Sequence, residues 1–210
     1  MMILVSLIAS YLMGAIPMGY LVLSWFAGKD LPALGSGRTG GTNAMRAGGW
    51  QLGVLTSVLD IAKGYAAVWL ASRLGPQVSW LPAAAGAFVV AGHNWSIWLY
   101  LKSGRLSGGA GTGPNVGAAT FFWPPILPVL VLTVLVLLFG LGYASITSFV
   151  VGLMIPLILA IRVVRGAPGA DWSQVAYGIA TLVMVTMALL PNFKRLLDGT
   201  ERLVGWRARR

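Results

Sequence analysis

A glycine-rich segment, residues 34–46 (LGSGRTGGTNAMR), combines the residue types that bind phosphate. Its glycines allow the backbone to turn tightly and to present N–H groups to an anion. Ser36, Thr42 and Asn43 add neutral hydrogen-bond donors, and the guanidinium of Arg46 is a planar fork suited to phosphate. We interpret the segment as a phosphate-binding loop. A solvated loop whose cations only mark the cytoplasmic side is the alternative.

A second short basic segment, residues 102–105 (KSGR), also contains glycine. If it lies at the same membrane face as the first segment, Lys102 and Arg105 can contact the same anion. Two such segments indicate a phosphorylated ligand more strongly than one does. The polar break Gly140–Ser145 and Asn192, at the end of the last apolar segment, are further candidates, with a plain turn as the alternative for each.

Three ionisable residues lie inside apolar segments. Asp60 and Lys63 are three positions apart, so on a helix they share a face and can pair. Charged groups within a membrane span are costly and usually face the interior of the helix bundle. His93 is the only histidine, and we expect it to be a hydrogen-bonded structural residue. A charge network that borders a binding site is the alternative for Asp60 and Lys63, and a catalytic role is the alternative for His93.

These residues belong to a chain with the composition of a membrane protein. Of its 210 residues, 57% are hydrophobic and only 10% are charged, whereas about a quarter are charged in soluble domains. Residues 3–26 and 78–101 contain no Asp, Glu, Lys or Arg, and each run exceeds the roughly 20 residues that span a bilayer. The first run is too long for a signal-peptide core, so we expect a retained helix.

The net charge of +10 has two explanations. Nucleic-acid binding is one, but Lys and Arg also gather on the cytoplasmic side of membrane proteins, where they meet anionic lipid. We favour membrane lipids as the partner and expect no nucleic acid. The chain has no cysteine, which excludes disulfides and thiolate metal sites, and we expect neither a metal nor another cofactor.

Apolar segments predict the membrane helices. Six are evident, at residues 3–26, 52–72, 78–101, 120–140, 144–161 and 174–190. With six crossings the basic tail would face away from the two basic loops, which violates the positive-inside rule. A seventh crossing between Arg105 and Phe121, glycine-rich and therefore buried among other helices, removes the conflict. We predict one all-α integral membrane domain, residues 1–210, with seven transmembrane helices, the N-terminus outside and the C-terminus cytoplasmic.

The motifs occur in the order seen in the PlsY-type acyl-phosphate:glycerol-3-phosphate acyltransferases, which this sequence resembles over nearly its whole length. Those are small bacterial inner-membrane enzymes. Residues 35–46 resemble the family pattern SGNxGATNxxR, and residues 60–64 resemble DxxKG. The other matches are Gly92-His93 with GH, residues 102–105 with KGGKG, residues 140–145 with GYxS, and Asn192 with the asparagine of the last motif.

The resemblance implies transfer of an acyl group from acyl phosphate to the 1-hydroxyl of glycerol 3-phosphate. The products are lysophosphatidic acid, used in phospholipid biosynthesis, and phosphate. No catalytic side chain is assigned, because a substrate phosphate oxygen can take the proton. The implied substrate-binding residues are Ser36, Thr42, Asn43, Arg46, Lys102, Arg105, Ser145 and Asn192, supported by Asp60, Lys63 and His93. We expect a monomer in the bacterial inner membrane.

The chain departs from the family pattern at four places. Arg38 stands where the pattern has an asparagine, and Gly41 replaces an alanine. The KGGKG segment is altered and has Arg105 in place of its second lysine. Leu189 occupies the position of a histidine three residues before Asn192. A divergent paralogue with another polar acceptor is therefore an alternative. A transporter or binding protein for an anionic metabolite and a lipid-binding scaffold are the others.

Overall fold

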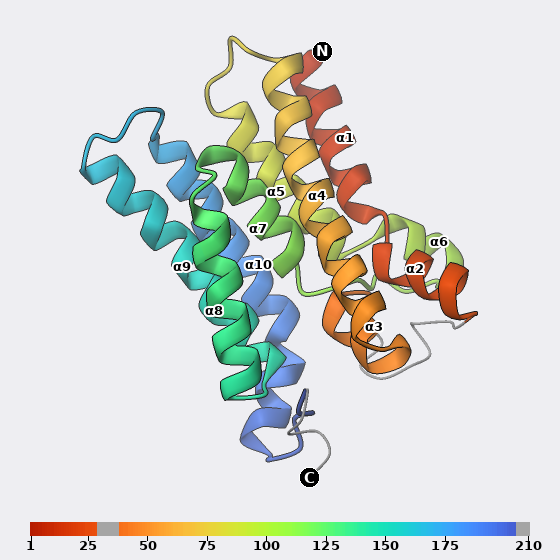
Figure 1. Ribbon diagram of the computed structural model, residues 1–210. Coiled ribbons are helices and arrows are strands. Elements are labelled where there is room, and N and C mark those ends of the chain that lie inside the picture. Colours follow the sequence, from red (N-terminus) through yellow and green to blue (C-terminus); the bar gives the residue numbers. More distant parts are fainter. Residues whose placement is uncertain (29–37, 205–210) are drawn as a thin grey trace.

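The computed structural model describes residues 1–28 and 38–204 (Figure 1). All the regular structure in these ranges is helical, apart from one isolated β-bridge between Ser96 and Ser107. The helices are α1 (Met2–Ala15), α2 (Met18–Ala27), α3 (Gly41–Gly48), α4 (Trp50–Leu74), α5 (Leu81–Asn94), α6 (Ile97–Ser103), α7 (Thr112–Phe122), α8 (Ile126–Gly140), α9 (Ala144–Val164) and α10 (Trp172–Leu197).

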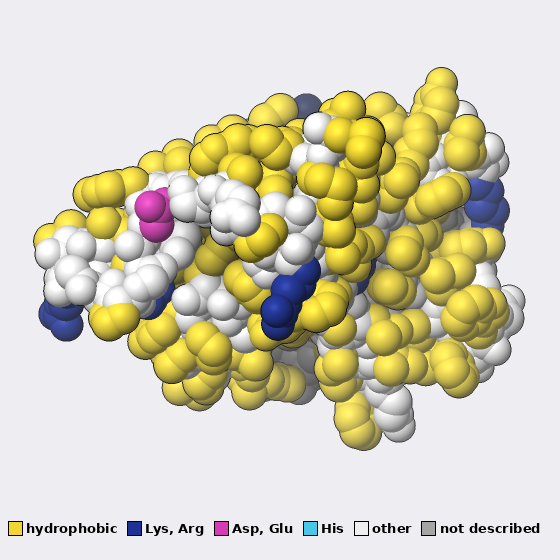
Figure 2. Space-filling model, turned by 90° about the horizontal axis from the view of Figure 1, so that it is seen from above, with side chains coloured by type: hydrophobic (Ala, Val, Ile, Leu, Met, Phe, Trp, Pro, Cys, Tyr) yellow, Lys and Arg dark blue, Asp and Glu magenta, His cyan; other side chains and the backbone are white. Residues whose placement is uncertain are grey.

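Four stretches in the described residues are long and apolar enough to cross a membrane: residues 2–27, α4, α9 and α10. α8 is apolar but shorter. The outer faces of these helices carry large exposed hydrophobic side chains, such as Val136 and Leu157. Figure 2 shows the same character at one end of the molecule, where hydrophobic side chains cover most of the visible surface. The chain is an all-α, multi-pass integral membrane protein.

The first apolar segment is broken near its middle. Pro17 has no backbone N–H and cannot continue α1, so the chain turns at Ile16 and Pro17 before α2 begins. The carbonyl oxygen of Ile16 accepts a hydrogen bond from Lys63 Nζ at 2.7 Å. The expectation of one continuous helix over residues 3–26 is therefore wrong, and a buried lysine stabilises the break.

The segment predicted at 78–101 is also two helices. Ser96 caps α6 by accepting from the backbone N–H of Leu99, and its hydroxyl donates to the carbonyl of Ala15. The hydroxyl of Tyr11 donates to the carbonyl of Trp95 at 2.7 Å. These bonds hold the two helix breaks side by side.

α7 is a short helix at the centre of the bundle (Figure 1), and residues 114–120 are all buried. Its packing on α4 is very close: a Cβ atom at Gly64 would lie 2.1 Å from the carbonyl oxygen of Pro114, so there is no room for a side chain at this position. The hydrophobic core around α7 includes Val116, Leu130 and Ile155. α7 occupies most of the glycine-rich segment expected to be buried. Residues 120–122 end this helix, so α8 begins later than predicted.

The two ends of the bundle differ. The N-terminus lies at one end and the C-terminal part of α10 at the other (Figure 1). α3 lies toward the C-terminal end, and α2 and α6 lie beside each other at an intermediate level. α2 and α6, which follow the helix breaks, and the polar helix α3 are therefore in the half of the molecule that contains the end of α10.

Candidate functional site

A cavity of about 740 Å³ lies among α3, α4, α7, α8, α9 and α10. One end is polar and is closed by α3, the start of α7 and the last turns of α10. The other end is a groove of apolar side chains. The polar residues that line it are Arg38, Thr42, Asn43, Arg46, Ser57, Asp60, His93, Thr112, Ser145, Thr147, Ser148, Asn192 and Glu201.

The apolar groove runs between α4 and α8. α4 contributes Val54 and Val58, four positions apart and so on one face of the helix. α8 contributes Leu135 and Phe139, also four apart, and Val116 of α7 lines the cavity between them. Val58 and Phe139 are each 54% exposed, so the groove opens on the apolar flank of the bundle. It has the shape and chemistry to hold a hydrocarbon chain.

Two arginines line the polar end. Arg46, in α3, donates from Nη2 to the carbonyl oxygen of Arg202 at 3.0 Å. Arg38 donates from Nη2 to the carbonyl oxygen of Ala188 in α10, and its own carbonyl accepts from Asn43 Nδ2 at 2.9 Å. Burial lowers the pKa of both guanidiniums, an effect that the carboxylate of Glu201 opposes. Partly buried cations at the end of an apolar groove favour an anionic head group.

Glu201 is the centre of a hydrogen-bond network in this end of the cavity. Its Oε1 accepts from Asn192 Nδ2 at 2.8 Å and from Ser145 Oγ at 3.3 Å, and its Oε2 accepts from Arg195 Nε at 3.1 Å. The side chain is only 3% exposed. Glu201 was not among the residues predicted from the sequence, although an acid within a mostly basic tail is a signal that could have identified it.

The N-terminus of α7 forms another wall. Residues 110–113 line the cavity, and Gly111 has a φ of +87°, which glycine adopts without strain. A Cβ atom at Gly109 would lie 1.9 Å from His93 Nε2, so only glycine permits this approach. A helix N-terminus carries partial positive charge and unpaired N–H groups. α7 thus adds a second attraction for an anion.

The predicted pairing of Asp60 with Lys63 is confirmed, and His93 joins it. Lys63 Nζ lies 2.9 Å from Asp60 Oδ1 and 3.0 Å from His93 Nδ1, while His93 Nδ1 is 3.5 Å from Asp60 Oδ1. All three side chains are buried. Asp60 and His93 also line the cavity. The network therefore supports the helices and borders the site at the same time.

The structure brings together most of the residues singled out from the sequence. Thr42, Asn43, Arg46, Ser145 and Asn192 all line the one cavity, together with Leu189, the residue in the family's histidine position. Ser36 lies outside the described residues.

The second basic segment lies elsewhere among the described residues. Lys102 Nζ is 2.5 Å from the hydroxyl of Tyr20 in α2 and lies 3.9 Å from the centre of its ring. Arg105 is exposed. Neither residue is part of the cavity lining. In the part of the chain that the structure describes, no three His, Cys, Asp or Glu side chains are close enough to hold a metal ion.

Comparison with known proteins identifies the family. The sequence profile of the family described as glycerol-3-phosphate acyltransferase matches residues 4–199. The chain belongs to the glycerol-3-phosphate acyltransferase family. The acyltransferase of Carboxydothermus hydrogenoformans is 34% identical over 212 residues, 98% of each chain. That of Prochlorococcus marinus is 36% identical over 202 residues, 96% of this chain and 95% of the other.

Solved structures agree with this assignment to the acyltransferase family. The fold is similar to the crystal structure of PlsY, an integral membrane glycerol 3-phosphate acyltransferase, in its glycerol 3-phosphate form. The TM-score is 0.83 at 27% identity, covering 97% of this chain and 96% of that one. The lysophosphatidic acid form of PlsY gives a TM-score of 0.81 at 25% identity over 97% and 95% of the two chains. The resemblance inferred from the sequence motifs is confirmed at the level of the family.

Proposed function

We propose that this acyltransferase transfers an acyl group from acyl phosphate to the 1-hydroxyl of glycerol 3-phosphate, forming lysophosphatidic acid and phosphate for phospholipid synthesis. The observation that carries the proposal is the two-part cavity. Its apolar groove between α4 and α8 suits an acyl chain, and its polar end, lined by Arg38 and Arg46, suits phosphate. The relatives are glycerol-3-phosphate acyltransferases, and the structures of PlsY with TM-scores of 0.83 and 0.81 are its glycerol 3-phosphate and lysophosphatidic acid forms.

Acyl transfer at this site needs little chemistry from side chains. An acyl phosphate is a mixed anhydride with a good leaving group. The hydroxyl oxygen attacks the carbonyl carbon, an ester C–O bond forms, and the C–O bond to the phosphate breaks. The departing phosphate leaves with the bonding electron pair and takes the hydroxyl proton. Holding both substrates close and aligned supplies much of the rate, and no protein base or metal takes part.

The polar end supplies the electrostatic part of catalysis. In this proposal Ser36 and Arg46 bind the phosphate of glycerol 3-phosphate, and Ser145 and Asn192 hold the substrates. Thr42 and Asn43 belong to the same pocket, whereas Lys102 and Arg105 lie outside the cavity lining and are assigned no substrate contact. The guanidinium of Arg46 and the N–H groups at the start of α7 are fixed before substrate binds, so they stabilise the charge that develops on the leaving phosphate.

The buried network of Asp60, Lys63 and His93 has a supporting role in this proposal. Lys63 holds the carbonyl of Ile16 at the break before α2, and the imidazole of His93 lies against Gly109. The network therefore fixes both the first helix break and the segment that leads into α7. We assign it to positioning the site, and none of its members to the chemical step.

The proposed topology has seven membrane crossings: α1 with α2, α4, α5 with α6, α7, α8, α9 and α10. The N-terminus and the end of α10 lie at opposite ends of the molecule, as an odd number of crossings requires (Figure 1). The C-terminal ends of α4 and α9 lie at the end of the molecule opposite to Arg38 and Arg46. They carry Arg73 on α4, and Arg162 and Arg165 on α9. We place the N-terminus outside and the C-terminus in the cytoplasm of a bacterial inner membrane, and propose that the chain works as a monomer and one domain.

The test uses purified protein in detergent micelles with acyl phosphate and glycerol 3-phosphate. Phosphate release that requires both substrates, with lysophosphatidic acid as the second product, supports the proposal. Arg46→Ala should remove at least nine-tenths of the activity, roughly the loss of one charge-assisted hydrogen bond, whereas Arg165→Ala should leave activity unchanged. Absence of transfer by a folded wild-type protein would contradict the proposal. Uptake of glycerol 3-phosphate by proteoliposomes would favour a transporter.

A further inference from the structure

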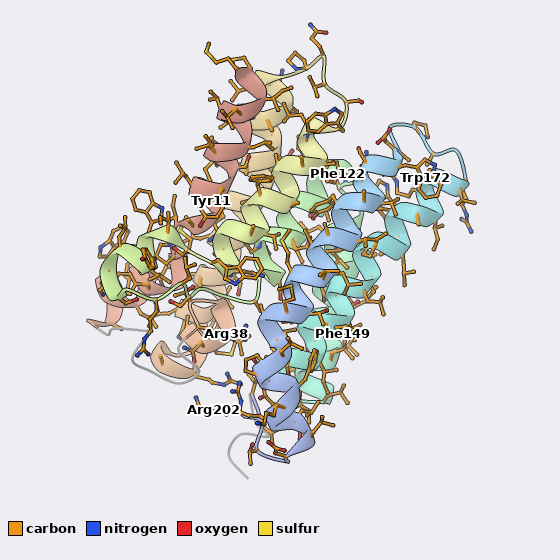
Figure 3. The ribbon with its side chains drawn as sticks, turned by 180° about the vertical axis from the view of Figure 1, so that it is seen from behind. Tyr11, Arg38, Phe122, Phe149, Trp172 and Arg202 are labelled. Carbon is orange, nitrogen blue, oxygen red and sulfur yellow. The ribbon has the colours of Figure 1, made fainter. Side chains whose placement is uncertain are left out.

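Arg38 is not among the substrate-binding residues that the family resemblance implies. It follows the glycines of the first loop, lines the cavity and donates to the carbonyl of Ala188 in α10. Leu189, the next residue of α10, also lines the cavity. In Figure 3 Arg38 lies in the same half of the molecule as Arg202. The guanidinium is thus held against the wall that α10 forms at the polar end.

α10 is irregular next to the carbonyl that Arg38 contacts. Pro191 lies inside this helix. A proline has no N–H to donate to the carbonyl four residues before it, and its ring opens the preceding turn of the helix. Residues 187–191 form that turn, which contains Ala188. The carbonyl left without an N–H partner is that of Met187, and the carbonyl of the next residue, Ala188, accepts from Arg38 in the same turn.

The charges around Arg38 leave the site electropositive. Arg38 and Arg46 both line the cavity with Glu201, and Glu201 is paired with Arg195. Three guanidiniums and one carboxylate leave an excess of positive charge where solvent is partly excluded. A partly buried cluster of this kind is stabilised by an anion that supplies the missing negative charge. The phosphate of a substrate is such an anion.

We propose that Arg38 is a substrate-binding residue that contacts the phosphate of glycerol 3-phosphate. This inference rests on the proposed function. The acceptor is favoured over the acyl donor because Arg38 is held on the α10 wall, whereas the acyl groove runs between α4 and α8. The contact is specific to a chain with arginine at this position, since the related motif has asparagine there.

The decisive variant is Arg38→Gln. Glutamine keeps an N–H donor, on a shorter side chain, while the charge is lost. We expect the KM for glycerol 3-phosphate to rise about ten- to a hundredfold, the usual effect of one charge-assisted hydrogen bond. The KM for acyl phosphate and the kcat at saturation should change little. Arg38→Lys should recover part of the loss, and Arg165→Gln, an exposed arginine at the other end, should behave as wild type.

Other kinetic results would overturn the inference. An unchanged KM for glycerol 3-phosphate in Arg38→Gln, with or without a lower kcat, would show that Arg38 only ties the loop to α10. A rise confined to the KM for acyl phosphate would assign the contact to the donor.

A binding measurement separates this inference from the proposed function. Glycerol 3-phosphate should raise the thermal unfolding temperature of the wild type and of Arg165→Gln but not that of Arg38→Gln. That result supports Arg38 even if no acyl transfer is detected. Equal stabilisation of all three proteins would refute the role of Arg38, whatever the activity of the wild type.

Discussion

The backbone N–H of Val204 donates to the carbonyl oxygen of Gly142 at 2.9 Å, which joins the C-terminal segment to the turn between α8 and α9. Val204 is 4% exposed. Because the chain doubles back here, the carboxylate of Glu201 enters the cavity and meets Ser145, in the first turn of α9, and Asn192 in α10. The chain after α10 is therefore part of the site.

Glu201→Gln should destabilise the protein and weaken catalysis. The substitution removes the only carboxylate beside Arg38, Arg46 and Arg195 in the described residues and leaves the guanidiniums to repel one another. We expect a loss of about 1–3 kcal/mol in the free energy of unfolding, as for a buried polar group that loses a charged partner. Thermal unfolding in detergent measures it. Asp198→Asn is the matched control because Asp198 is exposed in the same tail. Equal stability of the two variants would show that Glu201 is not the counter-ion of this cluster.

Gly109→Ala should displace the segment that leads into α7. The new methyl group would lie 1.9 Å from His93 Nε2, and overpacking of this kind costs about 1–3 kcal/mol. Both the unfolding temperature and kcat/KM for glycerol 3-phosphate should fall. Gly140→Ala is the control, since a Cβ atom there has no neighbour within 4 Å. If Gly109→Ala had the same unfolding temperature and kcat/KM as Gly140→Ala, the close packing of this segment on His93 would be disproved.

Asp60 and Lys63 should show strong energetic coupling. Replacing only one partner leaves a charge unpaired in the buried region and costs about 3–5 kcal/mol. Lys63→Met and Asp60→Asn should each destabilise the protein severely, and the double variant should be more stable than the sum of the two losses predicts. Unfolding of all four proteins in detergent gives the coupling energy. Strict additivity would contradict the ion pair as a stabilising interaction.

Val58→Trp should alter the preference for acyl-chain length. Val58 lines the groove on α4 and is 54% exposed, so an indole there would fill part of the space between α4 and α8. We expect activity with long-chain acyl phosphates to fall at least tenfold while activity with short chains is retained. Val183→Trp, on α10 and 52% exposed but outside the cavity lining, should leave the preference unchanged. An unaltered preference in Val58→Trp would place the acyl chain elsewhere.

Periodicity and motif order predicted the parts of this molecule that depend on local sequence. The pairing of Asp60 with Lys63 follows from helical spacing, and the glycine-rich stretch before Phe121 contains the buried helix α7. Motif order also predicted the family. The breaks between α1 and α2 and between α5 and α6 were not predicted, although Pro17 was a visible signal for the first of them.

Other features depend on contacts between distant segments, which one sequence does not reveal. His93 meets Lys63 across thirty positions, and Glu201 reaches Ser145 only because the tail folds back. Lys102 lies on Tyr20 rather than in the cavity lining, since the break at Ser96 directs α6 toward α2. Hydrophobic patterning fixes which face of a helix is buried, but not which neighbour buries it.

The groove between α4 and α8 is open along its side, and this determines how much of a lipid substrate must leave the bilayer. A tail seated against Val58 and Phe139 stays immersed among the acyl chains of neighbouring lipids. Extracting a hydrocarbon chain into water costs about 0.8 kcal/mol for each methylene group, and an enclosed tunnel reached from the cytoplasm would impose that cost at every turnover. Here only the head group has to change surroundings, so reactant and product can exchange by lateral diffusion.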